Sequence, residues 1–339
     1  MGEPAYRARQ LRRALFVRRV ATLDEVTDFP LALRERLAAE HGMPQLVASE
    51  VHAAEDGTTK YLFELHDGAR IESVALPRAT GRTTYCLSSQ VGCRMGCVFC
   101  ATGRMGIVRQ LSQGEIVGQV LELMRRHPSN TNPNLVFMGM GEPFDNLEAL
   151  LPALRTLTEE VGLSARRITV STSGLVDGIE ALDSLDRPIG LAISLTTGDA
   201  EERRRLMPVA GQIPIEVLLA TAARYGRRHR RKVTLECAII AGHNDDERTA
   251  RSLLERARGG PFKVNLIPLN PIDDYAGGRP RLDAVHRMAE LIWENGVVCT
   301  VRDSQGREVE AACGQLVHRQ DRRREEAPRR PALGPRRST

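Results

Sequence analysis

The chain lacks long apolar runs. No stretch of about 18 apolar residues occurs in its 339 residues, so the sequence argues against a membrane-spanning helix. Residues 1–20 are rich in arginine but have neither the apolar core nor the small-residue cleavage site of a secretory signal. We therefore expect a cytoplasmic protein, long enough for one large domain and a small appendage.

Cysteine is also scarce, yet three of the seven cysteines fall within eight positions. Cys93, Cys97 and Cys100 have the spacing C-x3-C-x2-C. A structural zinc site needs a fourth protein ligand, and its cysteines usually come as two C-x2-C pairs. A [4Fe–4S] cluster held by three cysteines instead leaves one iron open to a small molecule. The spacing favours an iron–sulfur site over zinc or over three unrelated core cysteines, and such a site needs a reducing compartment.

Basic charge is concentrated at one end of the chain. Residues 319–339 hold eight arginines against three acidic residues, which equals the whole net charge of +5. This segment has three prolines and few apolar residues, so we expect it to be disordered, either as a solvated tail or as an arm that contacts RNA. Arginine-rich clusters within 7–19 and 227–232 suit phosphate contacts, although charge alone does not establish an RNA partner.

The order of patterns predicts an α/β fold. Helical patterning continues to about Ala54, and alternation over 60–76 predicts a small hairpin. After that, β-rich and helical runs alternate, which indicates a parallel sheet in an open or closed barrel. The expected strands are 83–88, 135–140, 167–171, 189–195, 232–240, 262–269 and 297–302. The expected helices between them are 112–126, 147–161, 214–225, 246–257 and 281–295.

Polar and glycine motifs follow six of these expected strands. They are Cys93–Cys100, Gly139–Pro143, Ser171–Gly174, Ser194–Thr196, Gly242–Asp245 and Asn270–Pro271. In a β/α barrel the rim at the carboxyl ends of the strands is where chemistry is assembled. The positions of the motifs therefore predict one shared site.

Six segments resemble the radical S-adenosylmethionine (SAM) RNA methyltransferases that methylate an adenine carbon, the RlmN/Cfr group. They are CLSSQVGC (86–93), CVFCATG (97–103), MGMGEP (138–143), VSTSG (170–174), IPLNP (267–271) and AACGQL (311–316). The resemblance implies a partial (β/α)6-type TIM barrel as the radical SAM core, with a small N-terminal helical accessory domain. The domains that we expect are helical and RNA-binding over 1–58, a hairpin and linker over 59–82, the core over 83–318 and the basic tail over 319–339.

The resemblance also implies cofactors and the residues that bind them. Cys93, Cys97 and Cys100 would hold one [4Fe–4S] cluster, and its open iron would chelate SAM, whose one-electron cleavage gives a radical. The positions that match the family's SAM contacts are Gly141, Glu142, Ser171, Ser194, Leu195, Thr196 and Asn270.

Two further cysteines match the family's methyl-transfer chemistry. By resemblance, Cys313 takes the methyl group as a nucleophile and carries it to the ring carbon. Cys86 then attacks sulfur, releases the product and leaves a transient Cys86–Cys313 disulfide. Glu72 matches the proton acceptor of the C2-methylating members if one residue is inserted before Cys86. Cys237 and Cys299 lie in strand patterns without a motif, and we expect them to be structural.

The sequence departs from the family at one site and leaves three functions open. The usual Ser-Leu-His is here Ser194-Leu-Thr196, and the accessory domain lacks the expected tryptophan. The expected function is C2 methylation of adenine in 23S rRNA, and also in tRNA. The alternatives are methylation at C8 and a non-catalytic iron–sulfur protein that binds RNA. We further expect a monomer, no membrane partner and an external one-electron reductant such as flavodoxin.

Overall fold

The computed structural model describes residues 3–42, 46–129, 131–272, 275–302 and 305–316. The predicted basic tail, 319–339, lies outside the described residues. Within the described ranges, no helix is both long and apolar enough to cross a membrane.

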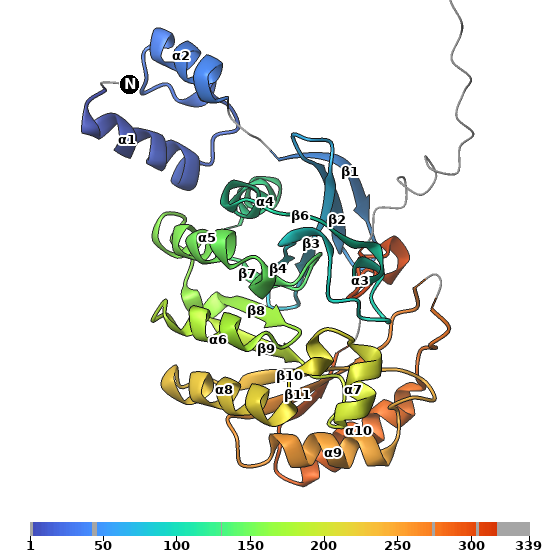
Figure 1. Cartoon of the computed structure of the whole chain (residues 1–339). Coiled ribbons are helices and arrows are strands. Elements are labelled where there is room, and N and C mark those ends of the chain that lie inside the picture. The colour runs from blue at the N-terminus through green and yellow to red at the C-terminus, as the bar shows by residue number, and fades with distance from the viewer. Residues whose placement is uncertain (1–2, 43–45, 130, 273–274, 303–304, 317–339) are drawn as a thin grey trace, which may run out of the picture.

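A ten-stranded mixed sheet is the framework of the molecule (Figure 1). Its strands, in spatial order, are β1 (Val47–Ala53), β2 (Thr59–Glu64), β3 (Arg70–Pro77), β4 (Thr83–Cys86), β7 (Asn134–Phe137), β8 (Ile168–Thr172), β9 (Gly190–Ser194), β10 (Val233–Ile239), β11 (Phe262–Pro268) and β12 (Cys299–Val301). Neighbours from β1 to β4 pair antiparallel. Neighbours from β4 to β12 pair parallel. Their carboxyl ends therefore meet at one edge.

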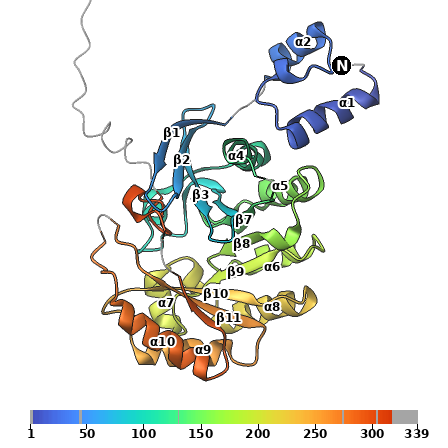
Figure 2. The same cartoon turned by 180° about the vertical axis from the view of Figure 1, so that it is seen from behind.

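Six β/α units build the parallel part of the sheet, which confirms the predicted partial (β/α)6 barrel. The strands β4, β7, β8, β9, β10 and β11 are each followed by a helix. In the same order, these helices are α4 (Gln113–Arg126), α5 (Leu147–Glu159), α6 (Val176–Asp183), α8 (Ile215–Arg228), α9 (Glu247–Ala257) and α10 (Leu282–Glu294). Of these six helices, only α6 was not among the expected ones. Figures 1 and 2 show α4, α5, α6 and α8 in a row along one side of the strands.

Helix α4 shows how the sequence builds such a unit. Ser112 caps its first turn by accepting a hydrogen bond from the Glu115 amide. Its buried apolar residues recur at helical spacing: Ile116, Val117, Val120, Leu123 and Met124. The buried amide of Gln119 donates to the Ser88 carbonyl (3.0 Å) and accepts from the Ser88 amide (2.8 Å). The helix thus fixes the loop that leads from β4 to the three-cysteine motif.

The structure corrects the expected helical region at its end. Residues 47–53 form strand β1, which pairs antiparallel with β2, and β3 pairs with both β2 and β4. The predicted hairpin is therefore a three-stranded extension of the barrel sheet. Its first strand was missed because apolar and polar residues do not alternate regularly over 47–53, and its pairing with β2 is what defines it.

The N-terminal residues form a small helical unit with a core of its own. It contains α1 (Ala5–Arg12), a π-helical turn (Arg13–Arg18) and α2 (Leu31–His41). Its buried apolar residues are Ala14, Leu23, Val26, Phe29 and Leu33. An ion pair between Arg12 and Glu160, together with Phe16 packed on the main core, joins the unit to the barrel. The predicted boundaries at residues 58 and 82 stay predictions.

Four short elements at the carboxyl edge were too short to be predicted. β5 (Gln90–Cys93) and β6 (Gly106–Gln110) form a two-stranded ribbon, with α3 (Ala101–Met105) between them. The fourth, α7 (Ala200–Leu206), lies between β9 and α8. The ribbon carries the three-cysteine motif, so these elements shape the site.

Candidate active site

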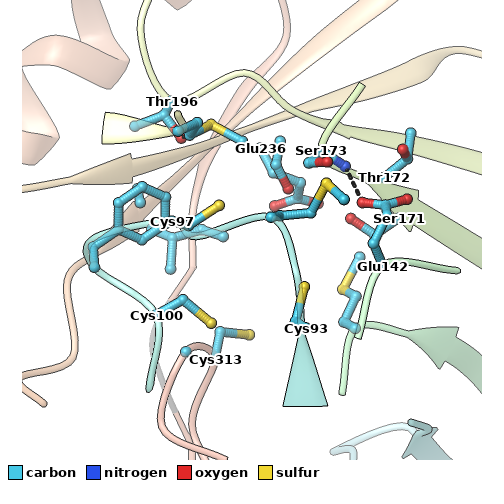
Figure 3. A pocket seen from close by; sticks show the side chains of 18 of the residues that line it. Cys93, Cys97, Cys100, Glu142, Ser171, Thr172, Ser173, Thr196, Glu236 and Cys313 are labelled. Carbon is cyan, nitrogen blue, oxygen red and sulfur yellow. Dashed lines mark hydrogen bonds between the residues drawn. The ribbon is translucent and has the colours of Figure 1, made fainter. Parts of the chain in front are cut away.

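A cavity lies at the carboxyl ends of the parallel strands, and its empty space is about 1000 Å³ with the open solvent at its mouth included. Figure 3 shows residues that line it. Its wall includes all three motif cysteines together with Cys313, and residues from β7, β8, β9, β10 and β11 or the loops that follow them. Four of the six predicted strand-end motifs, 93–100, 139–143, 171–174 and 194–196, therefore contribute to one site, whereas 242–245 and 270–271 do not line this cavity.

The motif cysteines are held by contacts on both sides of their loop. Cys93 ends β5, whereas Cys97 and Cys100 lie in the turn before α3. The Val98 amide donates to the Leu206 carbonyl at the end of α7 (3.1 Å). On the other side, the Ala101 amide donates to the Gly314 carbonyl (2.8 Å). The loop is thus tied both to α7 and to the segment that contains Cys313.

The chemistry of the cysteines fits an iron–sulfur cluster. Burial raises the pKa of Cys93 to about 12 and also raises the pKa values of Cys97 and Cys100. Thiols in such a place ionise when bound metal supplies positive charge. Among the described residues, no three His, Cys, Asp or Glu side chains converge on a point where a single metal ion could bind. A four-iron cluster would bind the three thiolates through three different iron atoms.

Glu142 is a buried carboxylate beside these cysteines. It accepts hydrogen bonds from the amides of Ser173 (2.7 Å, dashed in Figure 3) and Phe144 (3.1 Å). Its side chain is 3% exposed, and burial raises its pKa. A carboxylate with this environment gains most from a cationic ligand, such as the ammonium of SAM. The neighbouring Gly141 has φ +101° and would clash with Gln90 if it carried a Cβ.

The other predicted SAM contacts divide into two groups. Ser171, Ser194 and Thr196 line the cavity. Leu195 belongs to the hydrophobic core, and Asn270 donates to the Cys313 carbonyl (3.2 Å); neither lines this cavity. Asn270 is therefore placed to hold the Cys313 backbone.

Thr196, at the family's histidine position, adopts left-handed backbone geometry. Its φ is +67°, which is rare for a β-branched residue. Its amide donates to the Glu236 carbonyl (3.1 Å), and its carbonyl accepts from the Asn244 side chain (3.1 Å). These two hydrogen bonds hold the left-handed backbone conformation of Thr196. Thr196 lines the cavity with a hydroxyl and a methyl group where the family has an imidazole.

Cys86 and Cys313 meet at a second, smaller cavity. Cys86 at the end of β4 lines this cavity together with Cys313, and Cys313 lines the larger cavity as well. Both are free thiols, and burial raises the pKa of Cys86 to about 12. Figure 3 shows Cys313 directly beside Cys100. Cys313 therefore lies between the motif cysteines and Cys86.

Two charged residues at this junction were not predicted. Arg302 follows β12 and lines both cavities, and the negative charge that Cys313 can carry raises the pKa of Arg302. Glu236 of β10 lines the larger cavity and accepts from the Asn265 amide (2.6 Å). Arg302 ends an expected strand, and Glu236 interrupts an apolar strand run. The position of Arg302 at a strand end and the charge of Glu236 within an apolar strand were the sequence signals that could have identified them.

Glu72 is buried in the sheet and lines neither cavity. It forms an ion pair with Lys60 (3.1 Å). Val74, two residues on in β3, lies opposite Cys86 in β4, so Glu72 faces the same side of the sheet as Cys86. Cys237 and Cys299 are buried core residues, as expected for structural cysteines.

Known proteins resemble this chain along nearly its whole length. The Radical SAM superfamily model matches residues 87–253. A dual-specificity RNA methyltransferase RlmN from Halorhodospira halophila is 42% identical, with coverage of 94% of this chain and 89% of the relative. A probable RlmN from Chloroflexus aurantiacus is 44% identical, covering 94% and 88%.

A solved structure agrees with these sequence relatives. The crystal structure of a radical SAM methyltransferase from Sphaerobacter thermophilus has 42% identity and a TM-score of 0.89, over 93% of this chain and 94% of that one. Radical SAM proteins in general use SAM and a [4Fe–4S] cluster, which suits the cysteine-lined cavity. The predicted resemblance is confirmed: the chain belongs to the radical SAM superfamily and, within it, to the RlmN family of RNA methyltransferases.

Proposed function

We propose that this enzyme methylates C2 of adenine in RNA, in 23S rRNA and also in tRNA. The observation that carries the proposal is the place of Cys313, which lines the cavity of the motif cysteines and also the cavity of Cys86. A methyl carrier needs access to the methyl source on one side and to the resolving thiol on the other. The names of the relatives supply RNA as the substrate class.

Cys93, Cys97 and Cys100 would hold one cluster, and Glu142 would pair with the ammonium of SAM. Ser171, Ser194 and Thr196 line the same wall and would orient the rest of that ligand. One SAM would supply the methyl group, and a second SAM, after one-electron reduction through the cluster, would supply the radical that activates it. The electron would come from an external carrier such as flavodoxin, and we place the monomeric enzyme in the cytoplasm.

Cys313 and Cys86 would carry out the transfer to RNA. The Cys313 sulfur would first take the methyl group; the radical would then abstract a hydrogen atom from it, and the carbon radical so formed would add to the adenine ring. After the ring radical has given up one electron to the oxidised cluster, Glu72 would remove the ring proton, and the Cys86 thiolate would attack the Cys313 sulfur, so that the bond between this sulfur and the former methyl carbon breaks. The carbon keeps the electron pair and becomes the product methyl group on protonation. The resulting Cys86–Cys313 disulfide must be reduced before the next cycle.

Glu72 favours C2 over C8 as the target. Its ion pair with Lys60 holds the carboxylate on the sheet face that it shares with Cys86. Since Glu72 does not line either cavity, proton removal would need the bound base to approach this face or a side-chain movement.

Nucleoside mass spectrometry of rRNA and tRNA tests the proposal. Cells that lack the gene should lose 2-methyladenosine, and the wild-type chain should restore it. Cys313→Ala should not restore it, although the purified variant should still cleave SAM when a reductant is added. Recovery of 8-methyladenosine instead would favour the alternative carbon. Methylation by Cys313→Ala would refute the carrier role, and absence of SAM cleavage by the wild type would favour the non-catalytic alternative.

A further inference from the structure

Arg203 in α7 is a fully buried cation outside the wall of the active-site cavity. Its exposed fraction is 0%, and it is not among the residues that line the cavity. Burial lowers its pKa to about 10, which leaves it protonated at neutral pH. A buried charge is costly unless an opposite charge or hydrogen bonds compensate it.

The partners of Arg203 are main-chain carbonyls. Nη1 donates to the Ala210 carbonyl (2.5 Å), and Nη2 donates to the Ser173 carbonyl (2.6 Å). In the part of the chain that the structure describes, no carboxylate contributes to the electrostatic environment of Arg203, and its Nε atom is buried without a hydrogen-bond partner. Two carbonyls hold the guanidinium in place but do not neutralise it.

The anionic partner that Arg203 lacks is expected on the side of the motif cysteines. Cys97 lies close enough that a negative charge on its sulfur would favour the protonated form of Arg203. Cys97, Val98 and Phe99 pack against Leu206, Met207 and Ala210, which follow Arg203 in and after α7. The Val98 amide also donates to the Leu206 carbonyl. The helix that carries Arg203 therefore rests on the cysteine loop.

We propose that Arg203 is a fixed buried cation that offsets the negative charge of the cluster at Cys97 and thereby raises its reduction potential. This inference rests on the proposal that the three cysteines hold a four-iron cluster. Reduction adds one electron to a cluster that is already anionic, and a nearby positive charge favours that step. Because Arg203 does not line the cavity, it acts as a positioning and electrostatic residue: its Nη2 holds the Ser173 carbonyl, and the Ser173 amide donates to Glu142.

Electron paramagnetic resonance during a redox titration of the reconstituted full-length protein tests this inference. Arg203→Gln should lower the equilibrium constant for cluster reduction at least tenfold, which is about 59 mV for a one-electron couple. Arg203→Lys keeps the charge and should stay within about threefold of the wild type. Arg204→Gln is the matched control, since it removes the same charge from an exposed position of the same helix. If Arg203→Gln fails to fold, Arg203→Met supplies an uncharged variant without polar atoms.

Three outcomes would overturn the inference. Arg203→Gln could match Arg204→Gln, or Arg203→Lys could lower the potential as much as Arg203→Gln does, which would mark a packing role. A wild-type protein that takes up no cluster would instead overturn the proposed function together with this inference. If the wild type binds a normal cluster and every variant has the wild-type reduction potential, the inference about Arg203 fails while the proposed function stands.

Discussion

Burial of the ionised Glu142 carboxylate destabilises the folded protein, and we expect a bound cationic ligand to offset that cost. Glu142 is buried, and the amides of Ser173 and Phe144 donate hydrogen bonds that partly compensate its charge. Its pKa is raised by burial, so its favourable contribution to stability is present at pH values below its unfolded pKa. That contribution is lost as pH rises through the folded pKa, where the buried carboxyl must ionise. A cationic ligand would reverse this loss.

Glu142→Gln should therefore separate stability from binding. The ligand-free variant should gain stability relative to the wild type as pH rises from 4 to 8, because the amide does not ionise. Its affinity for SAM should fall about 10- to 100-fold, since a hydrogen bond to a charged group contributes about 1.5–3 kcal/mol. Thermal unfolding across this pH range and equilibrium dialysis of SAM measure the two effects. A variant that binds SAM like the wild type would remove Glu142 from the ligand site.

The β5–β6 ribbon is the element that presents Cys93, and its geometry depends on Gly92. Gly92 has φ +76°, and a Cβ at this position would lie 2.0 Å from the Gly106 carbonyl oxygen of β6. Gly106 has a similar φ of +73° but has open space around its Cβ position. Both glycines have a positive φ, but only a Cβ at Gly92 would collide with a neighbouring atom.

Gly92→Ala and Gly106→Ala are therefore a matched pair. Gly106→Ala should cost about 1–3 kcal/mol, because its backbone (φ +73°, ψ −178°) lies in a region that is essentially restricted to glycine, and should keep iron uptake close to that of the wild type. Gly92→Ala must in addition separate the two strands, so iron bound per chain after reconstitution should fall by more than half. Iron analysis with circular dichroism measures both. Equal iron content in the two variants would contradict a role of the ribbon in placing Cys93.

On the scale of the whole molecule, the N-terminal helical unit is a separate basic surface that touches the barrel at few points. Arg9 and Arg13 are exposed on its α1 and the π-helical turn. Figures 1 and 2 place this unit at the opposite end of the molecule from α9. A surface that binds RNA phosphates should act on affinity without changing the chemistry of the barrel.

Arg9→Gln combined with Arg13→Gln should weaken RNA binding uniformly across sequences. The slope of log affinity against log salt should become shallower by about 0.7 for each single-stranded phosphate that no longer has an arginine partner. SAM cleavage without RNA should be unchanged. Arg251→Gln on α9, which also removes an exposed arginine, is the control. Equal salt slopes for the double variant and the control would exclude this surface from RNA binding.

The sequence alone determined the parts of this protein that depend on local pattern. The three-cysteine run, the Gly141-Glu142 turn and the serines at the ends of β8 and β9 were predicted because each lies in a short motif at a strand end. Five of the six β/α units were predicted from alternating helical and strand periodicities, whereas α6 was missed and the number six came from the family resemblance. Cys86 and Cys313 were assigned through the family resemblance, and their roles stay proposals.

Tertiary structure decided what depends on contacts between distant segments. Cys86 and Cys313 lie more than 200 positions apart, and only the folded barrel brings them to one cavity with Arg302. The buried charge of Arg203 is brought near the cysteine loop because the end of α7 packs on that loop. Strand β1 exists because β2 pairs with it, and the β5–β6 ribbon and α7 are too short for a periodic signal. Local periodicity specifies elements, whereas cross-strand pairing and burial specify which side chains meet.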